Sequence, residues 1–265
     1  MEIDRRRLTA HLVDDEERLL AGRLLDVVEK ALAKSEPQAT DFYDPKSLQI
    51  ATGLLGAIPQ VSYKAYGGYA QAERQRLLIY PHYYMTEFLS PPLGAVEIAP
   101  VEPADNPKPA HHDYLGAVLG IGLKREKVGD LFLTSAGCQV ILAQEVLPAV
   151  LSHLNKVNRY PVIVQEIDLE QLAVQPARVK EMQTTVASLR LDAVAAYGFG
   201  TSRTKMAREI KAGQVKLNWR QTFDPAAPVK AGDVISMRGR GRVNIDEVRG
   251  ETRKGRTVLL LTRMY

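Results

Sequence analysis

The residues best suited to binding chemistry lie in a short basic stretch in the last third of the sequence. Guanidinium and ammonium groups at close spacing neutralise phosphates, and this neutralisation supplies much of the affinity of proteins for nucleic acid. Ser202 can cap a helix through its hydroxyl, and Gly213 can end one in the left-handed conformation. The cations between them are Arg203, Lys205, Arg208 and Lys211. We therefore expect a helix that presents phosphate-binding groups.

Apolar residues at regular spacings would position these cations. Met206 and Ile210 lie four residues apart, so they share the inward face of the helix. Residues 215–218 alternate between apolar and polar types, which predicts a half-buried strand. The turn residues Gly232-Asp233 then predict a second strand directly after them. The stretch is expected to place a basic helix beside a basic strand.

This stretch resembles the alpha-L RNA-binding motif, also called the S4 domain. The resemblance implies that the Ser-Arg helix and the following strand lie against structured RNA. Trp219 departs from the family pattern, which usually has a small residue after the asparagine, so we expect a bulkier turn. The matching residues are Arg190-Leu191-Asp192, Ser202-Arg203, 210–215, Asn218 and Gly232-Asp233-Val234.

The expected RNA contacts are polar and basic groups of this module. Phosphate contacts of this kind position the RNA, whereas structured RNA is otherwise recognised mainly by its shape and its 2′-hydroxyls, so we expect weak sequence preference. The candidate residues are Arg190, Ser202, Arg203, Lys205, Arg208, Lys211, Lys216, Asn218, Arg220, Arg238, Arg240 and Arg242.

The charge of the chain is divided between its two parts. The net charge is +4, but residues 188–265 carry 16 Lys/Arg and 7 Asp/Glu, a net of +9. The remaining 187 residues carry a net of −5. A solvated basic surface would explain the charge alone, but together with the motif it indicates an anionic partner for the C-terminal part.

The 265 residues are long enough for two domains or three small ones. We expect an α+β protein of three parts. Residues 1–75 would form a mainly helical N-terminal region and residues 76–175 a ferredoxin-like, RNA-recognition-like middle domain. Residues 176–265 would form the alpha-L RNA-binding domain.

The N-terminal region shows helical periodicity. Apolar residues recur at helical spacings between Leu8 and Leu32, and Asp44-Pro45 predicts the start of a second helix. Tyrosines surround Gly67-Gly68 and could stack on bases or pack one domain on the next; we favour packing. Residues 77–80 predict a short strand.

The middle domain follows a β-α-β-β-α-β order. The expected strands are 96–98, 130–134, 138–142 and 161–164, and the expected helices are 114–119 and 144–155. This order is that of ferredoxin-like domains, including the RNA-recognition fold. The third strand lacks the aromatic pattern with which such domains stack bases, so we expect the shape without the usual binding surface.

A glycine-punctuated turn in this domain carries a second candidate RNA contact, formed by Lys124, Arg125 and Lys127. Backbone N–H groups and three cations could hold a phosphate there. The plainer alternative is a helix end whose basic residues favour its dipole. The glycines match neither a Walker nor a dinucleotide fingerprint, so no nucleotide cofactor is expected.

Four segments of the first two parts carry a second resemblance: Thr40-Asp41-Phe42-Tyr43-Asp44-Pro45, 67–74, Asp113-Tyr114-Leu115-Gly116 and 124–130. With them, nearly the whole chain resembles the YlmH family, and it is also similar to the cyanobacterial and plastid branch labelled photosystem II S4-domain proteins. The resemblance implies binding to rRNA and tRNA on the large ribosomal subunit, with a role in translation or ribosome-associated quality control.

Arg190-Leu191-Asp192 is also similar to the sequence at the catalytic aspartate of pseudouridine synthases. Here it lies inside the predicted RNA-binding domain, with no separate catalytic domain, so we favour capping or ion pairing for Asp192. The expected protein is therefore non-catalytic. The alternatives are an RNA-modifying enzyme of pseudouridine-synthase type and a scaffold whose basic face binds an acidic protein.

The cysteine, histidine and apolar residues of the chain bear on metal sites, cofactors and cellular location. The single cysteine, Cys138, suits a reducing compartment, and no His/Cys spacing matches a zinc site. No apolar run approaches a membrane span and the N-terminus lacks a signal-peptide core. We expect no metal, no cofactor, no membrane partner, a cytoplasmic location and a monomer.

Overall fold

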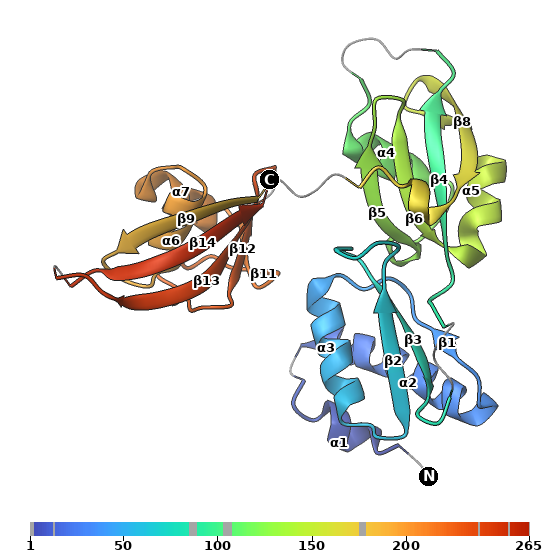
Figure 1. Ribbon diagram of the computed structural model, residues 1–265, viewed down its shortest axis with the longest axis horizontal. Coiled ribbons are helices and arrows are strands. Elements are labelled where there is room, and N and C mark those ends of the chain that lie inside the picture. Colours follow the sequence, from blue (N-terminus) through green and yellow to red (C-terminus); the bar gives the residue numbers. More distant parts are fainter. Residues whose placement is uncertain are drawn as a thin grey trace. The chain divides into compact units, whose positions relative to one another are not determined.

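The computed structural model describes residues 3–12, 14–84, 89–102, 108–174, 179–237, 239–253 and 255–264. The chain divides into two compact units, Met1–Val174 and Gln175–Tyr265, and each has its own hydrophobic core. Helices and sheets occur in both units, which confirms the α+β class (Figure 1).

The N-terminal elements form three helices packed on a small sheet. Asp14 and Asp44 cap α2 and α3 by accepting from the backbone N–H groups of Glu16 and Ser47. The strand order is β1-β3-β2, and β3 is buried along its whole length, so β3 belongs with these elements although the expected boundary at residue 75 precedes it. The elements are α1 (Arg5–Thr9), α2 (Asp15–Lys34), β1 (Gln38–Ala39), α3 (Pro45–Gly56), β2 (Val61–Tyr66) and β3 (Arg76–Pro81).

The middle elements have the ferredoxin-like topology. The strand order is β5-β6-β4-β8-β7 with antiparallel pairing throughout, and β4-α4-β5-β6-α5-β8 gives the expected β-α-β-β-α-β order. The short 3₁₀ turns are η1 (Arg125–Lys127), η2 (Gln144–Val146) and η3 (Leu169–Gln171). The other elements are β4 (Leu93–Pro100), α4 (His111–Gly120), β5 (Val128–Leu133), β6 (Cys138–Ala143), α5 (Leu147–His153), β7 (Lys156–Val157) and β8 (Tyr160–Ile167).

Other segments of the chain cover the second face of this five-stranded sheet. Phe42 and Leu172 pack with Ile141 of β6 in one buried cluster. The ring of Tyr69 meets Phe132 of β5 edge-on, with centroids 5.2 Å apart. An RNA-recognition domain binds bases on this face. Here these residues occupy part of the face, and Tyr69 packs on the sheet, as the sequence analysis favoured.

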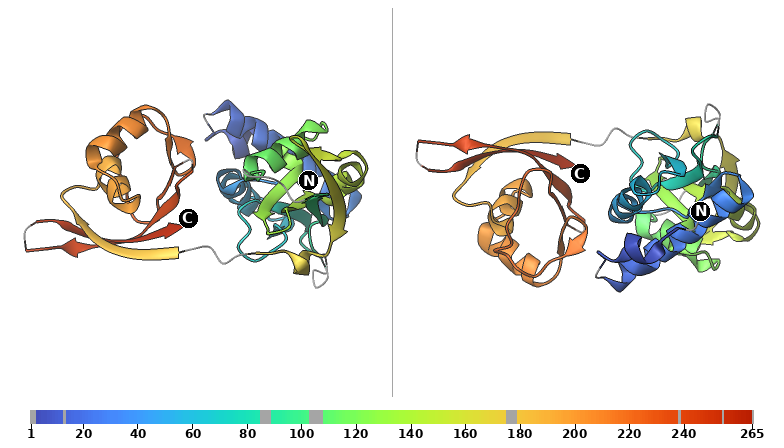
Figure 2. Two further views of the ribbon diagram at one scale, coloured as in Figure 1. Left: turned by 90° about the horizontal axis from the view of Figure 1, so that it is seen from above. Right: turned by 90° about the horizontal axis from the view of Figure 1, so that it is seen from below.

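The C-terminal unit is a six-stranded sheet with two helices on one face (Figure 2). Leu191 of α6, Met206 of α7, Ile235 of β12 and Val243 of β13 are fully buried between them. The strand order is β11-β10-β12-β13-β14-β9. The elements are β9 (Val179–Val186), α6 (Leu191–Gly198), α7 (Arg203–Lys211), β10 (Val215–Leu217), β11 (Arg220–Gln221), β12 (Val234–Met237), β13 (Gly241–Glu251) and β14 (Thr257–Met264).

Candidate nucleic-acid interface

The helix α7 presents the predicted cations. The Ser202 hydroxyl accepts a hydrogen bond from the Lys205 backbone N–H at 3.2 Å, so the predicted N-cap is present. Met206 and Ile210 are fully buried against the sheet and fix the rotation of the helix. All four of its cations are exposed: Arg203, Lys205, Arg208 and Lys211.

A buried carboxylate holds two arginines at the start of this surface. Asp192 is only 4% exposed, yet Arg190 donates to both of its oxygens at 3.2 and 3.0 Å. Arg203 Nε lies 3.1 Å from Asp192 Oδ2. Burial alone would raise the pKa of Asp192, but the hydrogen bonds from Arg190 and Arg203 outweigh it and lower the pKa. Asp192 thus stays ionised and brings together two half-exposed guanidinium groups from α7 and from the residue before α6.

The turn between β10 and β11 is held by Asn218. Its Nδ2 donates to Asp233 Oδ1 at 2.9 Å, and its Oδ1 accepts from the Val234 backbone N–H at 2.9 Å. Asn218 and Trp219 both have positive φ, 49° and 64°, as the two-residue hairpin turn of type I′ requires. Asparagine tolerates this conformation, but it is rare for a bulky residue such as Trp219. The departure from the family pattern therefore falls on a strained position.

The strand cations do not share the face of the sheet that carries α7. Lys216 pairs with Ser236, and Ser236 pairs with Arg242, so all three side chains project from the same face. Their strand neighbours, including Ile235 and Val243, point into the helix-covered core. Lys216 and Arg242 therefore lie on the face that the helices leave uncovered. The predicted contacts thus form at least two surfaces.

The remaining predicted residues are Arg220, Arg238 and Arg240. Arg220 is exposed on β11, Arg240 lies in the turn before β13, and Arg238 lies outside the described residues. Arg240 lines a depression of about 440 Å³ together with Phe199 and Arg263.

Arg263 is a cation that the sequence analysis missed. Its guanidinium lies 5.5 Å from the centre of the Phe199 ring. Arg263 comes beside Arg240 because β14 pairs with β13. No local sequence pattern predicts that pairing.

The cations of the second candidate contact have different surroundings. Lys127 Nζ lies 2.5 Å from Asp41 Oδ1 and 2.8 Å from Glu145 Oε1, so it joins the N-terminal and middle elements. Arg125 donates to the carbonyl oxygens of Val128 and Gly129. Lys124 is exposed. Two of the three predicted cations therefore have structural partners.

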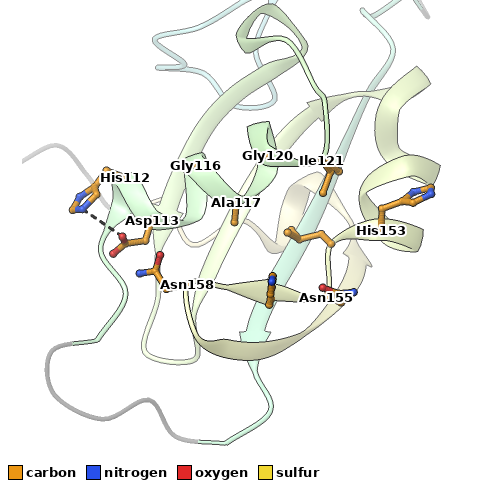
Figure 3. A pocket seen from close by; sticks show the side chains of 11 residues that line it. His112, Asp113, Gly116, Ala117, Gly120, Ile121, His153, Asn155 and Asn158 are labelled. Atoms are coloured by element: carbon orange, nitrogen blue, oxygen red, sulfur yellow. Dashed lines mark ion pairs between the residues drawn. The ribbon is translucent and has the colours of Figure 1, made fainter.

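A groove of about 530 Å³ lies between α4 and residues 153–158 (Figure 3). His112 and His153 stand at its opposite ends, with Gly116 and Gly120 between them along α4. The residues that line the groove include no Ser, Thr or Cys that could serve as a nucleophile beside a histidine. Among the described residues, no group of three His, Cys, Asp or Glu side chains could hold a metal ion, and no helix is long and apolar enough to cross a membrane.

The basic helix α7, the buried Asp192 of α6 and the helix-covered sheet define an S4-domain protein, the class of RNA-binding modules expected from the sequence. The S4 domain model matches residues 189–235. The models for the N-terminal domain of YlmH and for a putative RNA-binding domain in YlmH match residues 16–84 and 104–171. The chain belongs to the YlmH family.

One curated relative supports this assignment, and one solved structure shares the fold. The ribosome-associated protein quality control protein P2 of Bacillus subtilis (strain 168) is 35% identical over 215 residues, covering 81% of this chain and 82% of its own. A cell division protein ylmH structure from Streptococcus pneumoniae matches with a TM-score of 0.52 at 21% identity. That match covers 60% of this chain and 94% of the other, and it supports the fold.

Proposed function

We propose that the protein binds structured RNA, rRNA or tRNA on the large ribosomal subunit, without catalysing a reaction on it. The role would lie in translation or ribosome-associated quality control, in the cytoplasm, with the protein acting as a monomer. The observation that carries the proposal is the pair of Arg190 and Arg203 held over the buried Asp192, continued by the exposed cations of α7. The name of the Bacillus relative supports the ribosomal setting.

The geometry explains how this surface would bind. The buried charge of Asp192 fixes Arg190 and Arg203 before RNA arrives, so less side-chain entropy is lost on binding. Arg203 is held through Nε, and among the described residues no hydrogen bond uses its Nη groups. Those donors suit the oxygens of a phosphate. Lys205, Arg208 and Lys211 add charge along the helix. We infer affinity for the RNA backbone and little base preference.

The burial of Asp192 argues against the pseudouridine-synthase alternative. A catalytic carboxylate must reach the substrate, whereas both oxygens of Asp192 already accept from arginines and the residue is 4% exposed. Incubation of ribosomal RNA with the protein should yield no new pseudouridine. Its formation would favour the enzyme.

The double variant Arg203→Ala/Arg208→Ala tests the RNA surface. We expect weaker co-sedimentation with the large ribosomal subunit and a slope of log K against log salt reduced by about 2, because about one phosphate contact is lost per cation. Arg249→Ala/Arg253→Ala is the matched control, since it removes the same charge near the β13–β14 turn.

Equal losses in both double variants would mean that only net charge matters. Unchanged co-sedimentation of the α7 variant at moderate salt would overturn the proposal. RNase treatment of the complex provides a further check, because binding to an acidic protein partner would survive it.

A further inference from the structure

Two arginine side chains converge on one carbonyl oxygen in the unit Met1–Val174. Arg74 Nε donates to the Val128 carbonyl at 3.0 Å, and Arg125 Nη1 donates to the same oxygen at 2.5 Å. Arg74 also donates through Nη2 to the Phe42 carbonyl at 3.1 Å. Both arginines are partly buried. Two positive groups thus lie within hydrogen-bonding distance of a single neutral acceptor.

The surroundings leave this pair of charges without a direct counter-ion. None of the ion pairs formed by the described residues includes Arg74 or Arg125. Asp44, Glu73 and Asp130 act on both arginines through their charge alone. Asp130 accepts instead from the Tyr69 hydroxyl at 2.8 Å and from the backbone N–H of Glu73 at 2.7 Å. It also accepts from the backbone N–H of Arg74 at 3.2 Å. Its oxygens are therefore engaged by groups other than the two guanidiniums.

The electrostatics of the pair agree with this geometry. The pKa of Arg125 is lowered to about 10, mainly by burial and also by the charge of Arg74, against the opposing influence of Asp130, Glu73 and Asp44. Burial likewise lowers the pKa of Arg74, against the opposing influence of Asp44 and Asp130. Two like charges in a partly desolvated site raise the free energy of the folded state, and these carboxylates offset only part of that cost, since both pKa values stay lowered.

Donors remain available to such an anion. Among the described residues, no hydrogen bond uses Nε or Nη2 of Arg125, or Nη1 of Arg74. The exposed side chain of Lys124 adjoins Arg125 in the sequence. A tetrahedral anion with several oxygens could accept from two guanidiniums at once, as arginine clusters do for phosphate.

We propose that Arg74 and Arg125, with Lys124 beside them, form a phosphate-binding site in the unit Met1–Val174. It replaces Lys127 of the second predicted contact by Arg74, because Lys127 is held by Asp41 and Glu145. The ligand is a phosphate group, supplied by an RNA backbone or as free phosphate. Only the RNA source rests on the proposed function.

Thermal unfolding of the full chain with inorganic phosphate tests the site itself. At matched ionic strength, phosphate should raise the Tm of the unaltered protein by a few degrees relative to chloride, because a ligand of the folded state stabilises it. Arg125→Gln should lose most of this shift, and Arg125→Lys, which keeps the charge but not the fork of donors, should retain part of it. Lys30→Gln removes one exposed cation of α2 and should behave as the unaltered protein.

The Tm in chloride separates binding from a structural role. If Arg125 serves only to brace the Val128 and Gly129 carbonyls, Arg125→Gln should lower the Tm in chloride and keep the phosphate shift. If it forms the proposed site, the variant should change the Tm in chloride little, since a repulsion is also removed. An equal phosphate shift in Arg125→Gln and in the unaltered protein, or no shift in either, would overturn the proposal.

Binding of purified large-subunit ribosomal RNA distinguishes the two sources of phosphate. A salt slope reduced by about 1 in Arg125→Gln, but not in Lys30→Gln, assigns the site to RNA. A lost phosphate shift with an unchanged RNA slope assigns it to free phosphate. Failure of the unaltered chain to bind RNA would overturn the proposed function and leave the phosphate result standing.

Discussion

Gly67 shows how a single residue fixes the loop that covers the middle sheet. A Cβ at this position would lie 2.2 Å from the Arg74 carbonyl oxygen and 2.5 Å from the Ala72 Cβ. The loop must stay this tight, because Tyr69 and the backbone of Glu73 reach Asp130 from it. At Gly67 two backbone segments thus approach so closely that only glycine fits.

We expect Gly67→Ala to lower the free energy of unfolding by at least about 1–3 kcal/mol, the usual cost of overpacking. Gly53→Ala is the matched control, since a Cβ there meets nothing within 4 Å and the residue lies in α3. Replacing a helical glycine should instead stabilise by about 0.5–1 kcal/mol. Urea unfolding of both variants measures the difference, and losses of similar size would contradict the steric explanation.

At the same scale, caps and periodic apolar residues were predictable because they act within one turn of a helix. Ser202, Met206 and Ile210 have the expected roles. The pairing of Arg74 with Arg125 was not predictable, since their shared acceptor, Val128, joins residues that are distant in sequence. The RNA contacts themselves remain proposals.

Between elements, an ion network joins β3 to the middle domain. Arg76 is 3% exposed; it donates to the Thr40 and Pro92 carbonyls and contacts Glu145 at 3.0 Å. Lys127 contacts the same carboxylate. Burial would raise the pKa of Glu145, but hydrogen bonds from Lys127, its own backbone and Arg76 lower it to about 2. The charged form of Glu145 therefore belongs to the folded state.

The lowered pKa gives this network a defined pH dependence. The unfolded chain has a Glu pKa near 4.3, so the stabilisation by Glu145 is complete above about pH 5 and is lost as the pH falls towards about 2. The difference in unfolding free energy between the unaltered protein and Glu145→Gln should therefore shrink from pH 6 to pH 3. Urea unfolding measures it, with Glu170→Gln as the exposed control. A difference independent of pH would refute the assigned charge state.

The sequence predicted the order of the middle-domain elements, but it did not predict every strand of the C-terminal unit. Short apolar runs separated by turn residues predicted the β-α-β-β-α-β order, because each run lies within one strand or helix. The hairpin of β13 and β14 was missed: register shifts between Ile245 and Glu247 and between Arg249 and Glu251 interrupt the alternation in β13. β9 was missed as well, since it acquires its place only by pairing with β14.

On the scale of the whole molecule, the two units have separate cores. Every residue of the C-terminal core cluster lies between Met182 and Leu261. The division of charge, +9 against −5, was readable from composition and coincides with the RNA-binding module. The end of the first unit at Val174 follows from tertiary contacts, which composition does not reveal.

We expect the fragment 175–265 to fold by itself and to bind RNA with the same sensitivity to Arg203→Ala/Arg208→Ala as the full chain. The reason is that its buried residues contact one another within the unit. Cooperative thermal unfolding of the fragment, followed by circular dichroism, checks the first point and filter binding the second. A fragment without a cooperative transition would show that the core depends on the first unit.

The covered face of the middle sheet has a further consequence. Phe42 and the loop bearing Tyr69 belong to the same chain as the sheet on which they pack. The hydrogen bond from the Tyr69 hydroxyl to Asp130 stabilises this contact. A tethered group competes with a free one at an effective concentration in the millimolar range. The N-terminal segment therefore competes, as a tethered group, with any free ligand for this face of the sheet.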